Sequence, residues 1–239
     1  MKQHESNYVV LINKIYKRLK DTAFCLYGKY RFWRGLPGMT GKEIDILKKI
    51  LLAYGEKKLR VLEWGCGKST IYYTKYLRSL EIDCEWYGID NSREWFEWVR
   101  GRVDQAGLEE RVHLYLFEFT PFWLKPEWDW NNPGVCGFGP KEENELDYIY
   151  FPKKLNLKFD LIIVDARFRR RCLIEAQKLL APQGLVILHD AQKVHYHSPL
   201  TSYKYGQFVD SGYLYGDQNR IRAKMWIGSN DRQDLMVKA

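Results

Sequence analysis

The stretch Arg60-Val61-Leu62-Glu63-Trp64-Gly65-Cys66-Gly67-Lys68-Ser69-Thr70 decides how the rest of the chain is interpreted. It begins as a short apolar run, typical of a buried strand, and reaches a carboxylate at Glu63. Two glycines then follow, as in a tight turn from a strand into a helix. Such glycines let the backbone pass close to a bound nucleoside, and the carboxylate accepts hydrogen bonds from its polar groups. The stretch therefore predicts a nucleoside-binding strand–turn–helix unit.

Two other nucleotide-binding patterns fit this stretch less well. The string Gly67-Lys68-Ser69-Thr70 suggests a phosphate-binding P-loop, which requires G-x-x-x-x-G-K-[ST]. Its first glycine would fall at Leu62, inside the predicted strand, and Glu63 would repel the phosphates. The dinucleotide pattern G-x-G-x-x-G fails because Thr70 occupies the place of its third glycine.

Short apolar runs alternate with amphipathic stretches along most of the chain. The predicted strands are 59–63, 84–90, 112–117, 159–165 and 184–190. The predicted helices are 40–54, 68–80, 92–106 and 167–181, with a short one near 192. Two last strands, 207–215 and 220–228, flank a predicted hairpin turn at 216–219. The expected fold class is α/β: a Rossmann-like, doubly wound, mostly parallel seven-stranded sheet with an antiparallel C-terminal hairpin.

Two regions fall outside this alternation. Residues 1–55 contain a predicted amphipathic helix at 6–20 besides the one at 40–54, and are expected to form an N-terminal helical cap. Residues 56–239 then form the main domain, with an irregular insertion at about 119–157 that holds three tryptophans. Long irregular segments inside a compact domain are usually functional lids or mobile loops, so the insertion is a candidate for either, and the sequence does not decide between them.

Composition narrows the class of protein. The net charge is +8, and residues 1–60 carry 14 Lys and Arg against 5 Asp and Glu. This excess fits an anionic ligand, nucleic acid or an ordinary solvated basic surface. The five cysteines form no C-x-x-C pair, so neither a disulfide framework nor a structural zinc site is expected. A signal peptide and a long apolar segment are both missing, which predicts a cytoplasmic protein without a membrane partner.

A second acid, Asp90 in Tyr87-Gly88-Ile89-Asp90, ends the next predicted strand, where nucleoside-binding folds place a ligand for ribose hydroxyls. Together with Val61-Leu62-Glu63-Trp64-Gly65-Cys66-Gly67, this segment resembles the first two motifs of class I S-adenosylmethionine-dependent methyltransferases. The resemblance extends over about residues 59–228 and implies S-adenosylmethionine as the cofactor. The expected cofactor-binding residues are Glu63, Trp64, Gly65, Gly67, Ser69, Thr70, Asp90, Ser92 and Glu118.

Two strand ends remain for the methyl acceptor, since ligands of open α/β sheets bind at the carboxyl ends of strands. They carry Asp165, His189 and Asp190, which are the predicted catalytic residues. A neutral histidine or a carboxylate can take the proton of an acceptor hydroxyl, and a bound divalent ion can lower the pKa of that hydroxyl.

The spacing of Asp165 and Asp190 resembles metal-dependent O-methyltransferases of the catechol and caffeoyl-CoA type and the related sugar O-methyltransferases of macrolide pathways. In the former, two acids and an Asn directly after the second bind magnesium. This chain has Ala191 at that place. Asp165 and Asp190 are therefore candidate ligands for a divalent metal such as magnesium, with the dependence on metal left open.

Basic residues near these strand ends are predicted to bind the acceptor. Four arginines lie between positions 167 and 171, and one or two at most can face the pocket; Arg167 is the candidate. A guanidinium suits carboxylates and phosphates, so an anionic acceptor is expected. His195 and His197 are further acceptor-binding candidates, preferred over a three-histidine zinc site with His189.

These features together predict an S-adenosylmethionine-dependent O-methyltransferase that acts on a hydroxyl of a small-molecule or glycan acceptor. Two alternatives stay open: methylation of nucleic acid, and a non-catalytic nucleotide-binding module that kept the fold. A nucleic-acid partner is not expected, because the chain lacks an Asn-Pro-Pro-Tyr-type base-flipping motif; Asn131-Asn132-Pro133-Gly134 has no aromatic residue.

Overall fold

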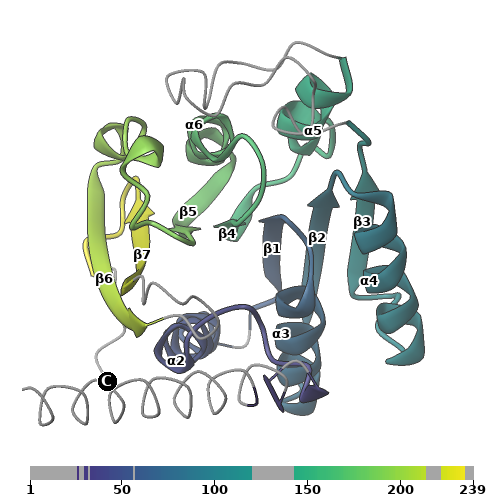
Figure 1. Cartoon of the computed structure of the whole chain (residues 1–239). Helices are drawn as coiled ribbons and strands as arrows, with labels where there is room; N and C mark the ends of the chain where they lie inside the picture. Colours follow the sequence, from purple (N-terminus) through teal and green to yellow (C-terminus); the bar gives the residue numbers. More distant parts are fainter. Residues whose placement is uncertain are drawn as a thin grey trace, which may run out of the picture.

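A seven-stranded sheet of order β3-β2-β1-β4-β5-β7-β6 forms the centre of the computed structural model (Figure 1). The structure describes residues 26, 30, 31, 33–55, 57–119, 143–213 and 222–234. Strand β7 runs antiparallel to both of its neighbours, and the other neighbouring pairs are parallel. This arrangement confirms the predicted mostly parallel sheet with its C-terminal hairpin. The strands are β1 (Leu59–Trp64), β2 (Cys84–Asp90), β3 (Val112–Leu116), β4 (Phe159–Val164), β5 (Leu180–Leu188), β6 (Tyr205–Tyr213) and β7 (Arg222–Ser229).

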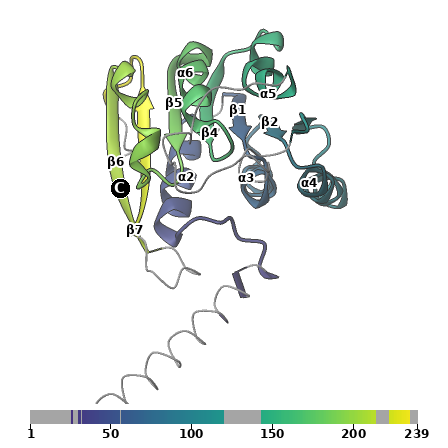
Figure 2. The same cartoon turned by 45° about the horizontal axis from the view of Figure 1, so that its top comes forward.

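Helices cover both faces of the sheet (Figures 1 and 2). Helices α2, α3 and α4 lie on one face, and α5 and α6 lie on the other. The chain thus crosses from one strand to the next as the alternating pattern predicts. The helices are α2 (Gly41–Leu52), α3 (Lys68–Ser79), α4 (Arg93–Gln105), α5 (Glu143–Lys154) and α6 (Arg169–Leu179), with single 3-10 turns at η3 (Val194–Tyr196) and η4 (Leu200–Ser202).

The apolar core is divided into two layers by the sheet. In β4, Leu161 and Ile163 belong to the layer under α2, α3 and α4, whereas Ile162 and Val164 belong to the layer under α5 and α6. Successive side chains of a strand point to opposite faces, so a continuous apolar run serves both layers. The carboxyl ends of the parallel central strands therefore lie along one edge of the sheet, next to a fully packed apolar core.

Helix α2 shares this core with the sheet. Leu47 and Leu51 are completely buried in the same layer as the strand residues. A capping box starts the helix: the Thr40 side chain accepts the Glu43 N–H, and the Glu43 carboxylate accepts the Thr40 N–H. The predicted helix at 6–20 and the predicted turn at 216–219 lie outside the described residues.

Helix α5 falls inside the stretch 119–157 that the sequence analysis expected to be irregular, and that expectation is wrong for its C-terminal part. Pro152 cannot donate to the carbonyl of Tyr148 one turn earlier. The indole Nε1–H of Trp64 in β1 donates to that carbonyl instead, at 3.0 Å. A tertiary contact thus satisfies the group that a local pattern leaves unpaired. Residues 120–142 lie outside the described part of the chain.

Within the described residues, no helix has the length and apolar character that crossing a membrane requires.

Candidate active site

The turn after β1 has a backbone that only glycine fits. Gly65 has φ of +93°, and a Cβ there would lie 2.6 Å from the carbonyl oxygen of Asp165. The turn at the end of β1 therefore packs directly against the backbone at the end of β4. A Cβ at Gly67 would touch the indole of Trp95, whose Nε1–H donates to the Cys66 carbonyl at 2.7 Å. Trp95 thus holds the turn from the side of α4.

The buried side chain of Glu63 stabilises the turn through hydrogen bonds. Its side chain is completely buried and accepts hydrogen bonds from the hydroxyls of Ser69 and Thr70 and from the indole of Trp86. Burial raises the pKa of Glu63 to about 7, against the effect of these three donors. Both carboxylate oxygens are engaged within the protein. Trp64 is also completely buried, so these four predicted cofactor-binding side chains lie beneath the turn, where they fix its shape.

Asp90 ends β2 beside the turn. One carboxylate oxygen, Oδ1, accepts the backbone N–H groups of Asn91 and Ser92. Within the described residues, no hydrogen bond engages the other oxygen, Oδ2. Burial raises the pKa of Asp90 to about 6 in spite of the two amides and Arg167, which favour the ionised form. Asp90 therefore offers one oxygen of a largely buried side chain to a hydroxyl donor at this edge.

The remaining predicted cofactor residues lie on the outer side of the same edge. Ser92 caps α4 by accepting the Trp95 N–H, and it is exposed. Glu118 follows β3 and forms a two-pronged ion pair with Arg93 of α4. That pair lowers the pKa of the exposed Glu118 carboxyl. Ser92 and Glu118 are accessible from solvent, in contrast to Glu63.

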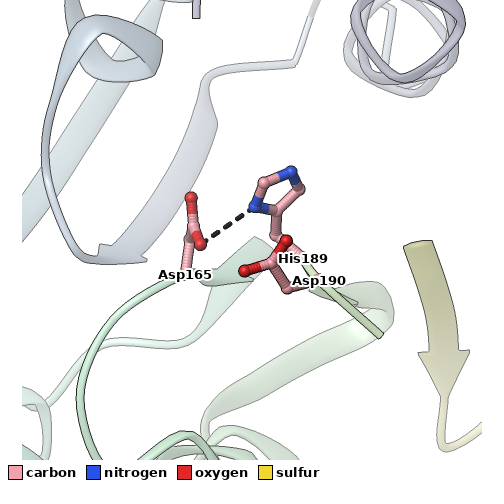
Figure 3. Close-up of side chains that lie close together, drawn as sticks. All are labelled: Asp165, His189 and Asp190. Carbon is pink, nitrogen blue, oxygen red and sulfur yellow. Dashed lines mark ion pairs between the residues drawn. The ribbon is translucent and has the colours of Figure 1, made fainter. Parts of the chain in front are cut away.

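The three predicted catalytic residues come together at the ends of β4 and β5 (Figure 3). Asp165 follows β4, and His189 and Asp190 follow β5. His189 Nδ1 forms an ion pair with Asp165 Oδ1 at 2.9 Å. The other Asp165 oxygen points away from the imidazole in Figure 3, and the Asp165 side chain is 28% exposed.

Arg169 joins the two carboxylates of this cluster. It begins α6 and is nearly buried, with its guanidinium 2.8 Å from Asp165 Oδ1 and 3.3 Å from Asp190 Oδ2. The same group donates to the carbonyl oxygen of His189 at 2.6 Å. Lys193 also pairs with Asp190. The sequence showed four neighbouring arginines without separating Arg169 from the rest, because position along a helix decides which one turns inward.

Glu43 is a second site residue that the sequence analysis did not identify. Its side chain is completely buried, with Oε2 3.6 Å from His189 Nε2 and Oε1 accepting the hydroxyl of Ser211. It also closes the capping box of α2, which is a local role with a recognisable sequence pattern. Its contact with His189 spans about 150 residues of chain, and no local pattern reports such a contact.

His189 is therefore held between two carboxylates. Burial disfavours the charged ring, but Asp165 and Glu43 outweigh it and raise the pKa of His189 to about 10. This environment favours the imidazolium, and an imidazolium lacks the lone pair that a general base needs. Burial would raise the pKa of Asp165, but the cations His189 and Arg169 lower it.

The ligand atoms of Asp165, His189 and Asp190 lie within 4.8 Å of one another, which is close enough for a shared metal ion. Two features fit a hard divalent ion poorly. The Arg169 guanidinium already contacts both carboxylates, and the imidazole faces a second carboxylate at Glu43. An ion would have to displace these cations or be repelled by them.

The predicted acceptor-binding residues lie around the cluster. Arg167 is exposed and close enough to Asp90 to favour its ionised form. His195 is exposed and packs against Tyr196. His197 is tied to the Ala191 carbonyl at 2.8 Å. Among the described residues, the group of possible metal ligands contains His189 with the two aspartates and neither of these histidines.

The sheet order is the Rossmann-like, mostly parallel order with an antiparallel C-terminal pair that the sequence analysis predicted, and solved O-methyltransferases share this fold. The chain is similar to the O-methyltransferase from Bacillus cereus in complex with SAH, with TM-score 0.53 and 13% identity over 87% of this chain and 90% of that one. It is also similar to the O-methyltransferase TomG from Streptomyces achromogenes, involved in tomaymycin synthesis and bound to SAM (TM-score 0.50, 16% identity, 87% and 89% covered). A third similar structure is cofactor-bound Rv0187 from MTB (TM-score 0.51, 17% identity, 77% and 79% covered). No protein-family model and no curated protein sequence matches the chain.

Proposed function

We propose that the chain is an S-adenosylmethionine-dependent O-methyltransferase acting on a hydroxyl of a small-molecule or saccharide acceptor. The observation that carries the proposal is the direct packing of the Gly65 turn against the backbone of Asp165. This packing joins a nucleoside-type binding edge at β1 and β2 to a charged cluster at β4 and β5. A methyltransferase needs those two halves side by side.

The cofactor half contains a shaped turn and a single receptive carboxylate. Glu63, Ser69 and Thr70 hold the turn, and the unengaged oxygen of Asp90 accepts ribose hydroxyls. Ser92 and Glu118 are proposed to border the adenine. When bound, S-adenosylmethionine would supply the methyl group: the acceptor oxygen bonds to the methyl carbon as the bond from carbon to sulfur breaks, and S-adenosylhomocysteine is the leaving group. The fold, which this chain shares with proteins solved with SAM or SAH, supports this cofactor.

The acceptor half is proposed to orient a hydroxyl and receive its proton. The outward oxygen of Asp165 accepts a hydrogen bond from the hydroxyl and takes the proton as the new bond to oxygen forms. His189 and Arg169 hold the other oxygen and keep the carboxylate ionised. A carboxylate with a lowered pKa is a weak base, so alignment of the reacting groups makes the main contribution. In this proposal His189 positions Asp165 and does not itself act as the base.

The charge of the cluster favours chemistry without a metal ion. Three carboxylates (Glu43, Asp165 and Asp190) face three cations (His189, Arg169 and Lys193). The cluster is therefore balanced without a divalent ion. Arg167 and His195 at its exposed rim are proposed to bind the acceptor, which favours an anionic group on it. Turnover that persists in EDTA supports this proposal, and turnover that returns only with magnesium would assign Asp165 and Asp190 to the metal.

The proposal is tested by separating cofactor binding from methyl transfer. Purified protein is titrated calorimetrically with S-adenosylmethionine, and methyl transfer to a panel of hydroxylated acceptors is measured. Asp165→Asn is expected to abolish transfer while cofactor affinity stays close to the original. The control is Asp147→Asn, which removes a carboxylate paired with Lys154 on α5 and should leave both properties unchanged. Cofactor binding without transfer to any acceptor would favour a non-catalytic module, and lost cofactor affinity in Asp165→Asn would move the acceptor site elsewhere.

A further inference from the structure

A groove on the helical side of the molecule lies outside the proposed methyl-transfer site. It has a volume of about 690 Å³ and follows the outer side of α3, between α4 and residues 33–35. Helices α3 and α4 lie side by side in both views (Figures 1 and 2). The α3 residues that line it are spaced at helical intervals along one face, from Lys68 at the first turn to Ser79 at the last. The groove therefore follows α3 over about 18 Å of helix.

The groove is lined by positive charge without any carboxylate. Arg34, Lys68, Lys75 and Arg102 contribute four cations, and the lining contains no Asp or Glu. Within the described residues, no ion pair engages Arg34, Lys75 or Arg102. Clustered cations without acids produce a local potential that attracts anions.

Aromatic rings alternate with these cations. Trp33, Tyr72, Tyr76 and Trp98 line the groove, and Trp33 is 80% exposed. An indole exposed to that extent on a concave surface leaves a large flat ring uncovered. Lys48 lies over the rings of Tyr72 and Tyr76, at 5.3 and 4.7 Å, and adds a further positive charge behind them.

We propose that this groove binds a nucleotide unit, meaning a phosphate ester joined to a flat base. The phosphate would contact Lys75 and Arg102, and the base would stack on an aromatic ring such as Trp33. Cationic side chains between stacking rings are the combination that single-stranded nucleic acid and nucleotides require. A neutral sugar is less suited, because the lining has no carboxylate or amide side chain to accept its hydroxyls.

At the N-terminal end of α3, the groove reaches the turn that is proposed to bind the cofactor. Lys68 directly follows Gly67, and Trp98 stacks on Trp95, which donates to the Cys66 carbonyl. The nucleotide site is nevertheless separate from the proposed methyl-transfer site, because it lies along the helices and not at the strand ends. Its existence does not depend on the proposed O-methyltransferase activity, and a single-stranded occupant would reverse the sequence-based expectation of no nucleic-acid partner.

The test measures binding of the full chain to an eight-nucleotide oligouridylate labelled for fluorescence anisotropy, with AMP as competitor. Lys75→Glu with Arg102→Glu is expected to weaken binding about tenfold or more and to reduce its dependence on salt. Trp33→Ala is expected to weaken it about fivefold or more through lost stacking. The matched control is Lys49→Glu with Arg100→Glu, the same charge change on α2 and α4 outside the groove.

The two ligands distinguish the source of the nucleotide. Competition by AMP at concentrations comparable to the oligonucleotide supports a free nucleotide, and a large advantage of the oligonucleotide supports a strand. Polyphosphate of the same charge that competes as well as the oligonucleotide would overturn the proposal, because it has no rings to stack. Equal loss of binding in the groove variant and in its control, or no binding to either ligand, would also overturn it. Unchanged calorimetric affinity for S-adenosylmethionine in the groove variant keeps this result independent of the proposed function.

Discussion

At the scale of single residues, the proposed cofactor contact depends on the ionisation of Asp90. Its pKa is about 6, above the ordinary 3.8, since burial disfavours the charge. Binding of ribose hydroxyls favours the carboxylate, so affinity for S-adenosylmethionine should be constant above pH 7 and fall as pH drops below about 6. The limiting decline is about tenfold per pH unit. Calorimetric titration between pH 5 and 8 measures it.

The matched variant for this prediction is Asp90→Asn. It keeps the size of the side chain and removes the titrating group, so its affinity should be lower by about ten- to a hundredfold at pH 8. Its decline below pH 6 should be largely lost. A decline of the same size in Asp90→Asn would assign the pH dependence to another group, of which Glu63 with a pKa of about 7 is the nearest candidate.

Glu43 is the second residue whose chemistry can be isolated. Glu43→Gln removes one of the two carboxylates beside the His189 imidazolium and should destabilise the fold by about 3 kcal/mol, the range for breaking a buried pair. Urea unfolding measures it, with Glu85→Gln as the control. Glu85 makes partly exposed pairs with Lys58 and Arg60, so its removal should cost less than about 1 kcal/mol.

The coupling energy between Glu43 and His189 tests their contact more directly than the loss of stability in Glu43→Gln alone. In a double-mutant cycle with His189→Asn, the two changes should fall short of additivity by at least about 1 kcal/mol. Additive effects would mean that Glu43 acts only as the helix cap of α2 and as the acceptor of the Ser211 hydroxyl.

At the scale of elements, two glycines in contrasting surroundings test the turn after β1 that is proposed to bind the cofactor. Gly65→Ala places a methyl group against the carbonyl oxygen of Asp165 and forces a residue with φ of +93°. Loss of S-adenosylmethionine binding is expected, with destabilisation of at least about 1–2 kcal/mol. Gly101→Ala lies inside α4 with open space around its Cβ, so it should stabilise by about 0.5–1 kcal/mol. Gly65→Ala with unchanged cofactor affinity would contradict the role of this turn.

The sequence predicted those strands and helices whose own residues show a clear apolar pattern. The strands β1, β2 and β3 and the helices α3 and α4 match their expected ranges within about two residues. Helix α5 was not predicted because Pro152 and the aromatic residues around it do not form a helical pattern. The hydrogen bond that Pro152 cannot make is replaced by one from Trp64 of β1. The same division applies to which residues the structure brings together, while their catalytic roles stay a prediction. Strand ends predicted Asp165, His189 and Asp190, whereas Glu43 and Arg169 depend on how α2 and α6 pack on the sheet.

At the scale of the whole molecule, the buried cluster joins α2, α6 and the ends of β4 and β5, so its ionisation should govern stability against pH. His189 has a folded-state pKa of about 10, above the ordinary 6.5. Its stabilising contribution is therefore complete below about pH 6.5 and is lost as pH rises towards 10. The pKa of Asp165 and that of Asp190 are lowered by the neighbouring cations. Their contributions are complete above the ordinary 3.8 and are lost as the solution becomes more acid.

Both contributions are present together between about pH 5 and 6.5, so the cluster should raise the thermal midpoint most in that window. Calorimetric or fluorescence melting from pH 4 to 10 measures the profile. His189→Gln removes the group that titrates on the alkaline side, so its midpoint should be lower at pH 6 and should fall less between pH 7 and 10. A control such as His113→Gln, on β3 away from the cluster, should retain the alkaline decline. An alkaline limb of equal steepness in His189→Gln would show that the imidazolium does not hold these four elements together.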